Sequence, residues 1–163
     1  MKEIKIIKNR SDIGAGTRGS DMGIDAIEIA AINKGSNYFD RYDFEDVITE
    51  NESIYNKENN SFGKRIENVF NQCKRLSNHV KVNLQEGKFP VVISGDHSSA
   101  LGTISGVKAA NPTERVGVIW IDDKRIVCCR TWVFIATNGC QSIGDFTGRS
   151  RKRIAAIESC RRR

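Results

Sequence analysis

The sequence predicts an α/β protein, a parallel sheet with flanking helices, followed by an irregular carboxy-terminal tail. Two short apolar runs, at residues 89–95 and 116–122, have the β-branched composition of buried parallel strands. A helical pattern at residues 99–110 separates them, and strand, helix, strand is the order of a right-handed crossover unit. With 163 residues, the chain is long enough for one ordinary domain and too short for two.

The first part of the chain is expected to form a strand, a loop, a short helix and a weak second strand. Two adjacent isoleucines within residues 5–8 predict the first strand, and four glycines among residues 11–23 indicate tightly turning backbone. Asp25 is expected to cap the helix, and Gly35 to end it. Residues 43–48 favour the weak strand. The apolar face expected for the helix consists of Ile24, Ile27 and Ala31.

Two longer helices follow in the pattern of apolar residues. From about residue 61 to Gly87, apolar side chains recur every three or four positions and form one continuous stripe. A second helix is predicted from Ser99 to Ala110, ended by the Asn-Pro pair at 111–112. The stripe of the first helix contains Ile66, Val69, Phe70, Cys73, Leu76, Val80 and Leu84.

Polar side chains follow both apolar strands, where the strands end. Asp96 and His97 come after the first strand, and Asp122 and Asp123 after the second. In open α/β sheets, binding and chemistry collect beyond the carboxyl ends of the strands. If the two strands are neighbours, a histidine and at least one carboxylate meet there, a set suited to a divalent metal such as manganese.

Several motifs resemble those of the ureohydrolase family, which includes arginases and agmatinases. They are Phe-Pro-Val-Val-Ile-Ser-Gly-Asp-His-Ser at 89–98, Leu-Gly-Thr at 101–103, the strand at 116–122 and Gly-Ala-Gly-Thr-Arg-Gly at 14–19. The glycine-rich motif is similar to the bacterial arginase pattern, so we favour arginase over agmatinase, which stays open as an alternative. The resemblance covers residues 1–123, as the amino-terminal part of a three-layer α/β/α enzyme. It implies a homo-oligomeric enzyme in which hydroxide bound to two Mn²⁺ ions hydrolyses L-arginine to L-ornithine and urea.

The resemblance also implies which residues are metal ligands. His97 matches the first histidine ligand, and Asp122 matches the first aspartate of a second motif, Asp-Ala-His-any-Asp. The match ends there, because residues 123–126 read Asp-Lys-Arg-Ile, with Lys124 in place of the second histidine and Ile126 in place of the second aspartate. The later Asp-any-Asp motif of the family has no counterpart in the sequence. We therefore expect manganese binding to be impaired and assign no catalytic residue.

The composition changes where the motif ends. Residues 1–123 hold 16 Lys or Arg and 18 Asp or Glu, whereas residues 124–163 hold 10 basic and 2 acidic residues. Arginine outnumbers lysine only in the second segment, which also contains four of the five cysteines. Since a domain boundary normally lies in a polar linker, this triple change favours a different coding origin for residues 124–163, by frameshift or fusion.

Other classes of function are less well supported by the sequence. Arginines at 149–153 and 161–163 could attract phosphate backbones, so a non-catalytic protein that binds nucleic acid through this tail is the alternative function. Nucleic acid is not the expected partner, because no recognition motif accompanies these charges. A zinc site is not expected either, since the tail cysteines form no C-x-x-C pair. The first residues lack the hydrophobic stretch of a secretory signal, which predicts a cytoplasmic protein without a membrane segment.

Overall fold

Among the described residues, three strands and three α-helices belong to the first of two compact units of the chain. The structure, a computed structural model, describes residues 2–15, 18–55, 65–122 and 125–129. The units are Met1–Glu114 and Arg115–Arg163, and each is described by itself. In the described parts of the chain, no helix is long and apolar enough to cross a membrane. The first unit contains β1 (Ile4–Asn9), α1 (Gly23–Asn33), β2 (Asp43–Asp46), α2 (Ile66–Gln85), β3 (Phe89–Ser94) and α3 (Ser99–Ala110), with short 3-10 segments at Ser20–Met22, Phe39–Arg41 and Asn51–Tyr55.

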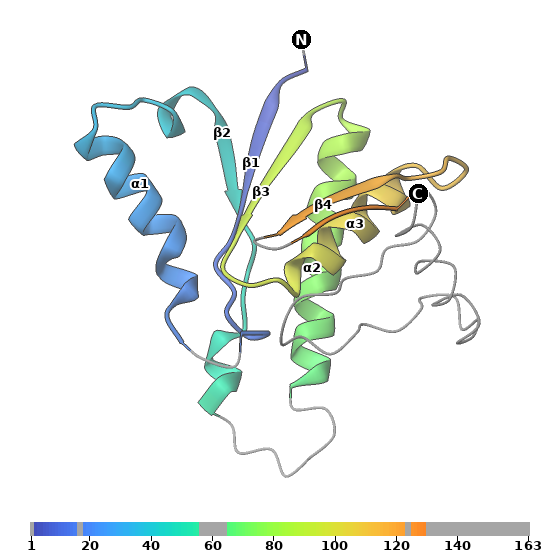
Figure 1. The fold of residues 1–163 in the computed structure, drawn as a ribbon, viewed down its shortest axis with the longest axis horizontal. Coiled ribbons are helices and arrows are strands. Elements are labelled where there is room, and N and C mark those ends of the chain that lie inside the picture. The colour runs from blue at the N-terminus through green and yellow to red at the C-terminus, as the bar shows by residue number, and fades with distance from the viewer. Residues whose placement is uncertain (1, 16–17, 56–64, 123–124, 130–163) are drawn as a thin grey trace. The chain divides into compact units, whose positions relative to one another are not determined.

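The strands of this unit form a parallel sheet in the order β2-β1-β3 (Figure 1). Ile6 of β1 lies opposite Phe44 of β2 on one side and Val91 of β3 on the other. The prediction of a parallel sheet is therefore confirmed, and so is the weak strand within residues 43–48.

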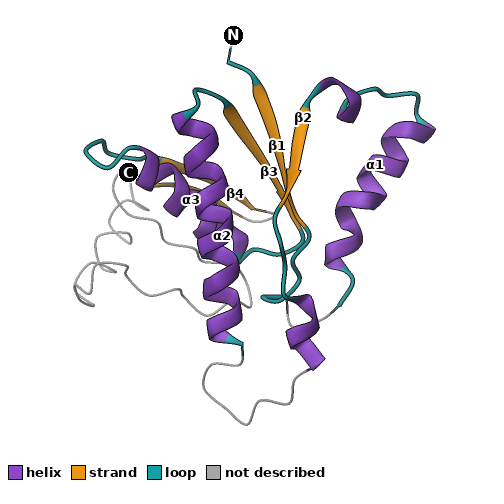
Figure 2. Cartoon of the chain, turned by 180° about the vertical axis from the view of Figure 1, so that it is seen from behind, coloured by secondary structure: helices purple, strands orange, loops and turns teal. Residues whose placement is uncertain are grey.

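Helices cover both faces of the sheet, with α1 on one side and α2 with α3 on the other (Figures 1 and 2). Alternation along β1 explains this arrangement, because successive side chains point to opposite faces of a sheet. Lys8 forms an ion pair with Glu28 of α1, whereas the next residue, Asn9, accepts a hydrogen bond from Gln72 of α2. The main apolar core lies on the α2 side and consists of Ile7, Val47, Leu76 and Val80, with Leu84, Val92 and Val107 packed against it.

The ends of the helices confirm some predictions and correct others. Gly35 and Gly87 follow α1 and α2 with φ of 67° and 77°, as expected for glycines that end helices. The prediction that Asp25 caps α1 is wrong, since the helix begins at Gly23 and the Asp25 carboxylate accepts hydrogen bonds from Arg10. The expected start of the long helix near residue 61 lies outside the described residues, and the described part begins at Ile66.

A two-stranded antiparallel sheet is described in the second unit. It pairs β4 (Val118–Asp122) with β5 (Arg125–Cys129), so that Asp122 lies opposite Arg125. The sequence predicts β4 as the second strand of a parallel crossover unit with β3. Because the two strands belong to different units, that pairing stays a prediction. The two strands are close in the sequence, so their pairing costs little chain entropy, and residues 126–129 are apolar enough to pair locally. Within the tail that was expected to be irregular, Arg125–Cys129 forms β5, and residues 130–163 lie outside the described residues.

Candidate functional site

The loops that follow β1 and β3 meet at the carboxyl end of the parallel sheet. The backbone N–H of Gly14 donates a hydrogen bond to the Oδ2 atom of Asp96, at 3.2 Å. A Cβ atom at Gly95 would lie 2.5 Å from the carbonyl oxygen of Ser11 and 2.7 Å from that of Ser20. The two loops therefore approach so closely that only glycine fits at position 95. This is the edge of the sheet where the sequence predicted a site.

Asp96 binds to groups of its own loop. Its Oδ1 atom accepts hydrogen bonds from the backbone N–H of Ser98, at 2.7 Å, and from the Ser98 hydroxyl. The Ser99 hydroxyl donates to the Asp96 carbonyl oxygen at 2.5 Å. These contacts hold the turn between β3 and α3 in place. The His97 side chain lies within that turn and is exposed.

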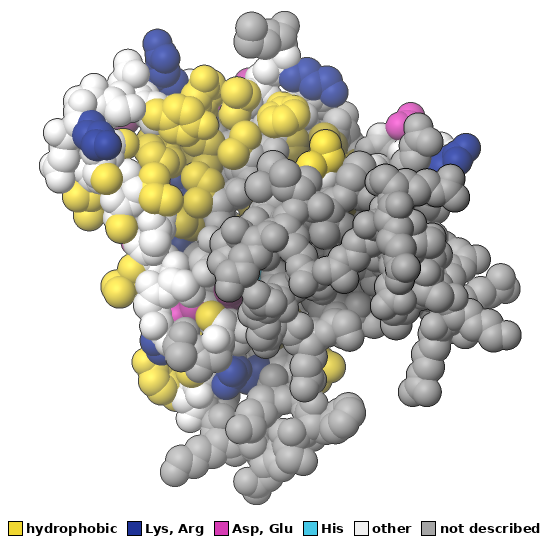
Figure 3. Space-filling model, in the orientation of Figure 1, with side chains coloured by type: hydrophobic (Ala, Val, Ile, Leu, Met, Phe, Trp, Pro, Cys, Tyr) yellow, Lys and Arg dark blue, Asp and Glu magenta, His cyan; other side chains and the backbone are white. Residues whose placement is uncertain are grey.

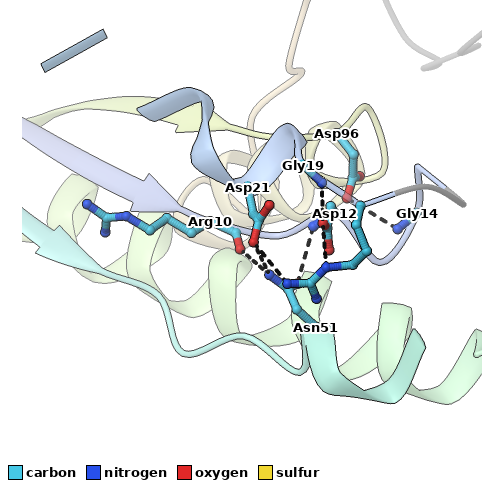
Figure 4. A network of polar contacts seen from close by, with 8 residues as sticks. Arg10, Asp12, Gly14, Gly19, Asp21, Asn51 and Asp96 are labelled. Carbon is cyan, nitrogen blue, oxygen red and sulfur yellow. Dashed lines mark hydrogen bonds and ion pairs between the residues drawn. The ribbon is translucent and has the colours of Figure 1, made fainter. Parts of the chain in front are cut away.

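A second acidic residue, Asp12, is buried in the loop after β1 (Figure 4). Its Oδ2 atom accepts a hydrogen bond from the Gly19 N–H at 3.2 Å and lies 3.4 Å from Nε of Arg18. The side chain of Asn51 connects this loop to the segment after β2. It accepts from the Asp12 N–H at 3.2 Å and donates to the Arg10 carbonyl oxygen at 2.7 Å. Together with the hydrogen bond from Gly14 to Asp96, these contacts join the loop after β1 to the segment after β2 and to the turn after β3.

Burial raises the pKa of Asp12 above its usual value, because desolvation disfavours the charged carboxylate. The nearby Asp21 carboxylate also raises this pKa, whereas the Gly19 N–H and the Arg18 guanidinium lower it. Oδ1 of Asp12 is buried without a hydrogen-bond partner among the described residues. The desolvation is therefore only partly offset by the hydrogen bond and the ion pair.

Asp12 is expected to make the protein more stable as the pH falls. A carboxyl with a raised pKa in the folded state binds its proton more tightly when folded, so its contribution is fully present below the unfolded pKa. This contribution is lost as the pH rises through the folded pKa. The free energy of unfolding of wild type minus that of Asp12→Asn should therefore decrease as the pH rises above about 4, with a slope of at most about 1.4 kcal/mol per pH unit. Urea denaturation at a series of pH values measures this difference.

Glu50 provides a control with the opposite sign. Hydrogen bonds from the side chains of Asn68 and Arg75 lower its pKa, so its contribution is present above its usual pKa and lost as the pH falls. The difference between wild type and Glu50→Gln should therefore increase with pH. If the free energies of unfolding of wild type and Asp12→Asn changed with pH in parallel, the raised pKa of Asp12 would be contradicted.

The sequence did not predict a series of hydrogen-bonded polar side chains that lies next to the site. The side-chain amide of Asn9 donates to the Ser94 hydroxyl at 2.9 Å, and Gln72 donates to Asn9 at 2.5 Å. These bonds connect the ends of β1 and β3 to α2. Gln72 gave no signal because it borders the apolar stripe of its helix, and burial of a polar group depends on its partners.

The two predicted metal ligands lie in different units. His97 belongs to the first unit, and Asp122 is the last residue of β4 in the second. Their proximity stays a prediction, as does the assignment of each as a ligand. Within the described ranges, no group of three or more His, Cys, Asp or Glu side chains could hold a metal ion.

Comparisons of the sequence with known proteins all identify the arginase family. The model of the arginase family matches residues 2–123. The arginase of Bacillus caldovelox is 35% identical over 124 residues, which cover 75% of this chain and 41% of the relative. The arginase of Brevibacillus brevis is 36% identical over 126 residues, 74% of this chain and 40% of the relative.

The comparison with solved structures identifies the same family. The solved structure of the arginase from Bacillus caldovelox superposes with a TM-score of 0.56 at 36% identity, covering 75% of this chain and 41% of the other. The chain spans about two fifths of the length of the relatives that it matches. Sequence and fold agree over the segment that contains the Gly-Asp-His-Ser motif, and the chain therefore belongs to the arginase family.

Proposed function

We propose that this chain derives from an enzyme that hydrolyses L-arginine to L-ornithine and urea, and that in its present form it does not catalyse this reaction. The observation that supports the proposal is the interruption of the second metal motif directly after Asp122. His97 and Asp122 are the two positions that we assign to a former manganese site. Residues 124–163 are in this proposal a segment of different coding origin, added by frameshift or fusion.

The donor atoms of this chain do not fit a centre of two manganese ions. Mn²⁺ prefers carboxylate oxygens and imidazole nitrogens, and two such cations need several anionic ligands. Lys124 brings an ammonium group to the position of a histidine ligand and repels a cation. Ile126 has no donor atom at all. Two assigned ligands do not satisfy the coordination of two ions.

The contacts at the edge of the sheet give further support. Asp96 accepts hydrogen bonds from Gly14 and Ser98, and Asp12 from Gly19, so these carboxylates hold the loops together. The Arg18 guanidinium lies between Asp12 and Asp21 and neutralises part of their charge. Both loops that line this edge are therefore held in part by donors of the chain itself.

A urea assay tests the proposal. The full chain is incubated with manganese and either arginine or agmatine, beside the variants His97→Ala and His79→Ala. His79 is the matched control, because it lies on α2 beside Glu45 and is not one of the assigned ligands. We expect urea release from all three proteins to equal that of the buffer. The proposal would be contradicted if wild type and His79→Ala released urea and His97→Ala did not. Release from agmatine alone would favour agmatinase ancestry.

A further inference from the structure

We propose that the loop after β1 is held by a pH-sensitive clamp, in which Asp12 carries a proton in mildly acidic solution and shares it with the Asp21 carboxylate, and that loss of this proton loosens the loop. The clamp consists of these two acids and Arg18. Its side chains lie at the edge of the sheet beside Asn51, which donates to Oδ2 of Asp21 at 3.4 Å (Figure 4). The clamp therefore lies within the candidate site.

One guanidinium group serves both carboxylates. Nε of Arg18 lies 3.4 Å from Oδ2 of Asp12, and Nη2 of Arg18 lies 3.4 Å from Oδ2 of Asp21. When both acids are ionised, two negative charges meet one positive charge, so the three side chains carry a net charge of −1. A single proton on the pair makes this net charge zero. The charges of the clamp thus favour the binding of one proton.

The surroundings make the excess negative charge costly. The Asp12 side chain is fully buried and that of Asp21 is 18% exposed, so water screens their repulsion only in part. Among the described residues, no donor reaches Oδ1 of Asp12. Burial, the Asp21 charge and a hydrogen bond with the Asp21 side chain raise the pKa of Asp12 more than the Gly19 N–H and Arg18 lower it. A proton held between the two carboxyl groups removes the repulsion.

The titration is assigned to the clamp because Asp21 and Arg18 are the charged groups that shift the pKa of the buried acid. Other charged groups nearby have partners of their own. The guanidinium of Arg10 binds carboxylates of α1 and β2, and Asp96 accepts hydrogen bonds from two backbone N–H groups. The segment after β2 contributes the ring of Tyr55, which lies 5.6 Å from the Arg18 guanidinium. The hydrophobic side chains that Figure 3 shows over the region of α1, β2 and β1 carry no group that titrates between about pH 4 and 7.

Loss of the proton loosens the loop for a thermodynamic reason. Opening of the loop exposes Asp12 to water, where a carboxyl group has its usual pKa. Because the closed loop binds the proton more tightly than the open loop, opening becomes more favourable as the pH rises. Two backbone hydrogen bonds mark the closed loop, from Gly19 to Asp12 and from Gly14 to Asp96 in the turn after β3. The pH therefore controls how firmly the two loops of the candidate site are joined.

Hydrogen exchange of the Gly14 and Gly19 amides tests the clamp. The full chain is followed by NMR from about pH 4 to 7, and the rates are corrected for intrinsic exchange. The opening equilibrium of both amides is expected to increase with pH, by at most about tenfold per pH unit. The amide of Ile7, in the central strand β1, should stay better protected, because the loop opens without the sheet. Opening that does not depend on pH would overturn the proposal, and so would equal protection of Ile7 and the two glycines.

Two substitutions change the charge of the clamp in opposite directions. Asp21→Asn removes a negative charge, so the pKa of Asp12 should fall and opening should lose most of its pH dependence. Arg18→Gln removes the positive charge, so the pKa of Asp12 should rise. Asp25→Asn is the matched control, because this carboxylate binds Arg10 instead, and it should behave as wild type.

Carbon-13 NMR of the aspartate carboxyl groups measures the pKa of Asp12 in wild type and in each variant. A pKa at or below the usual value in wild type would overturn the proposal without reliance on any substitution. An unchanged pKa of Asp12 in Asp21→Asn would overturn it as well, since the two acids would then not share a proton.

Discussion

Replacement of Leu76 by alanine is expected to lower the free energy of unfolding by about 2–5 kcal/mol. Leu76 is fully buried where α2 packs against the sheet, beside Ile7 and Val80. Truncation removes buried methyl groups and leaves a cavity that the rigid strand β1 cannot fill. Urea denaturation followed by circular dichroism measures the loss.

Val82→Ala on the same helix is the control for this substitution. The Val82 side chain is 40% exposed, so its truncation should change the stability by no more than about 0.5 kcal/mol. Equal effects of the two substitutions would show that α2 does not pack on the sheet through the face described.

Gly106→Ala is expected to destabilise the protein by about 1–3 kcal/mol, although alanine is the better helix former. A Cβ atom at position 106 would lie 2.6 Å from the carbonyl oxygen of Ser77 and 2.7 Å from Cβ of Val80. Because the first of these atoms belongs to the backbone of α2, relief requires the two helices to move apart. Thermal unfolding of the purified variant measures the effect.

Gly23→Ala separates packing from helix propensity. Gly23 also lies in a helix, but a Cβ atom there would meet nothing within 4 Å. This substitution should leave stability unchanged or raise it by a few tenths of a kcal/mol. A loss at Gly23 as large as that at Gly106 would mean that the close approach of α2 and α3 is not the cause.

Local patterns in the sequence predicted most elements of the first unit. A short apolar, β-branched run identified β3, and apolar residues at every third or fourth position identified α2. The helix α3 spans Ser99 to Ala110 as expected. These predictions succeeded because the patterns that indicate strands, helices and helix ends involve only residues that are close in the sequence. The expected apolar face of α1 was only partly right, since Ile24 is buried and Ile27 is half exposed. A short helix that is apolar on several sides does not reveal which side meets the sheet.

The candidate site, in contrast, could not be predicted from local patterns. The glycine-rich segment marked the correct loop, but Asp12 gave no signal of its own. Its burial depends on Asn51, which is 39 positions away, and on the close contact of Gly95 with the loop after β1. Contacts of that range cannot be read from a window of neighbouring residues.

The sequence by itself determined the family resemblance and the set of donor atoms after Asp122, because the identity of a side chain decides what it can coordinate. Only the tertiary structure decided that β3 pairs with β1, that Asn51 reaches the loop of Asp12, and that the Gly14 N–H binds Asp96. Each of these depends on which distant segments meet. The free energy of bringing distant segments into contact is a balance of chain entropy, desolvation and hydrogen bonding over the whole unit.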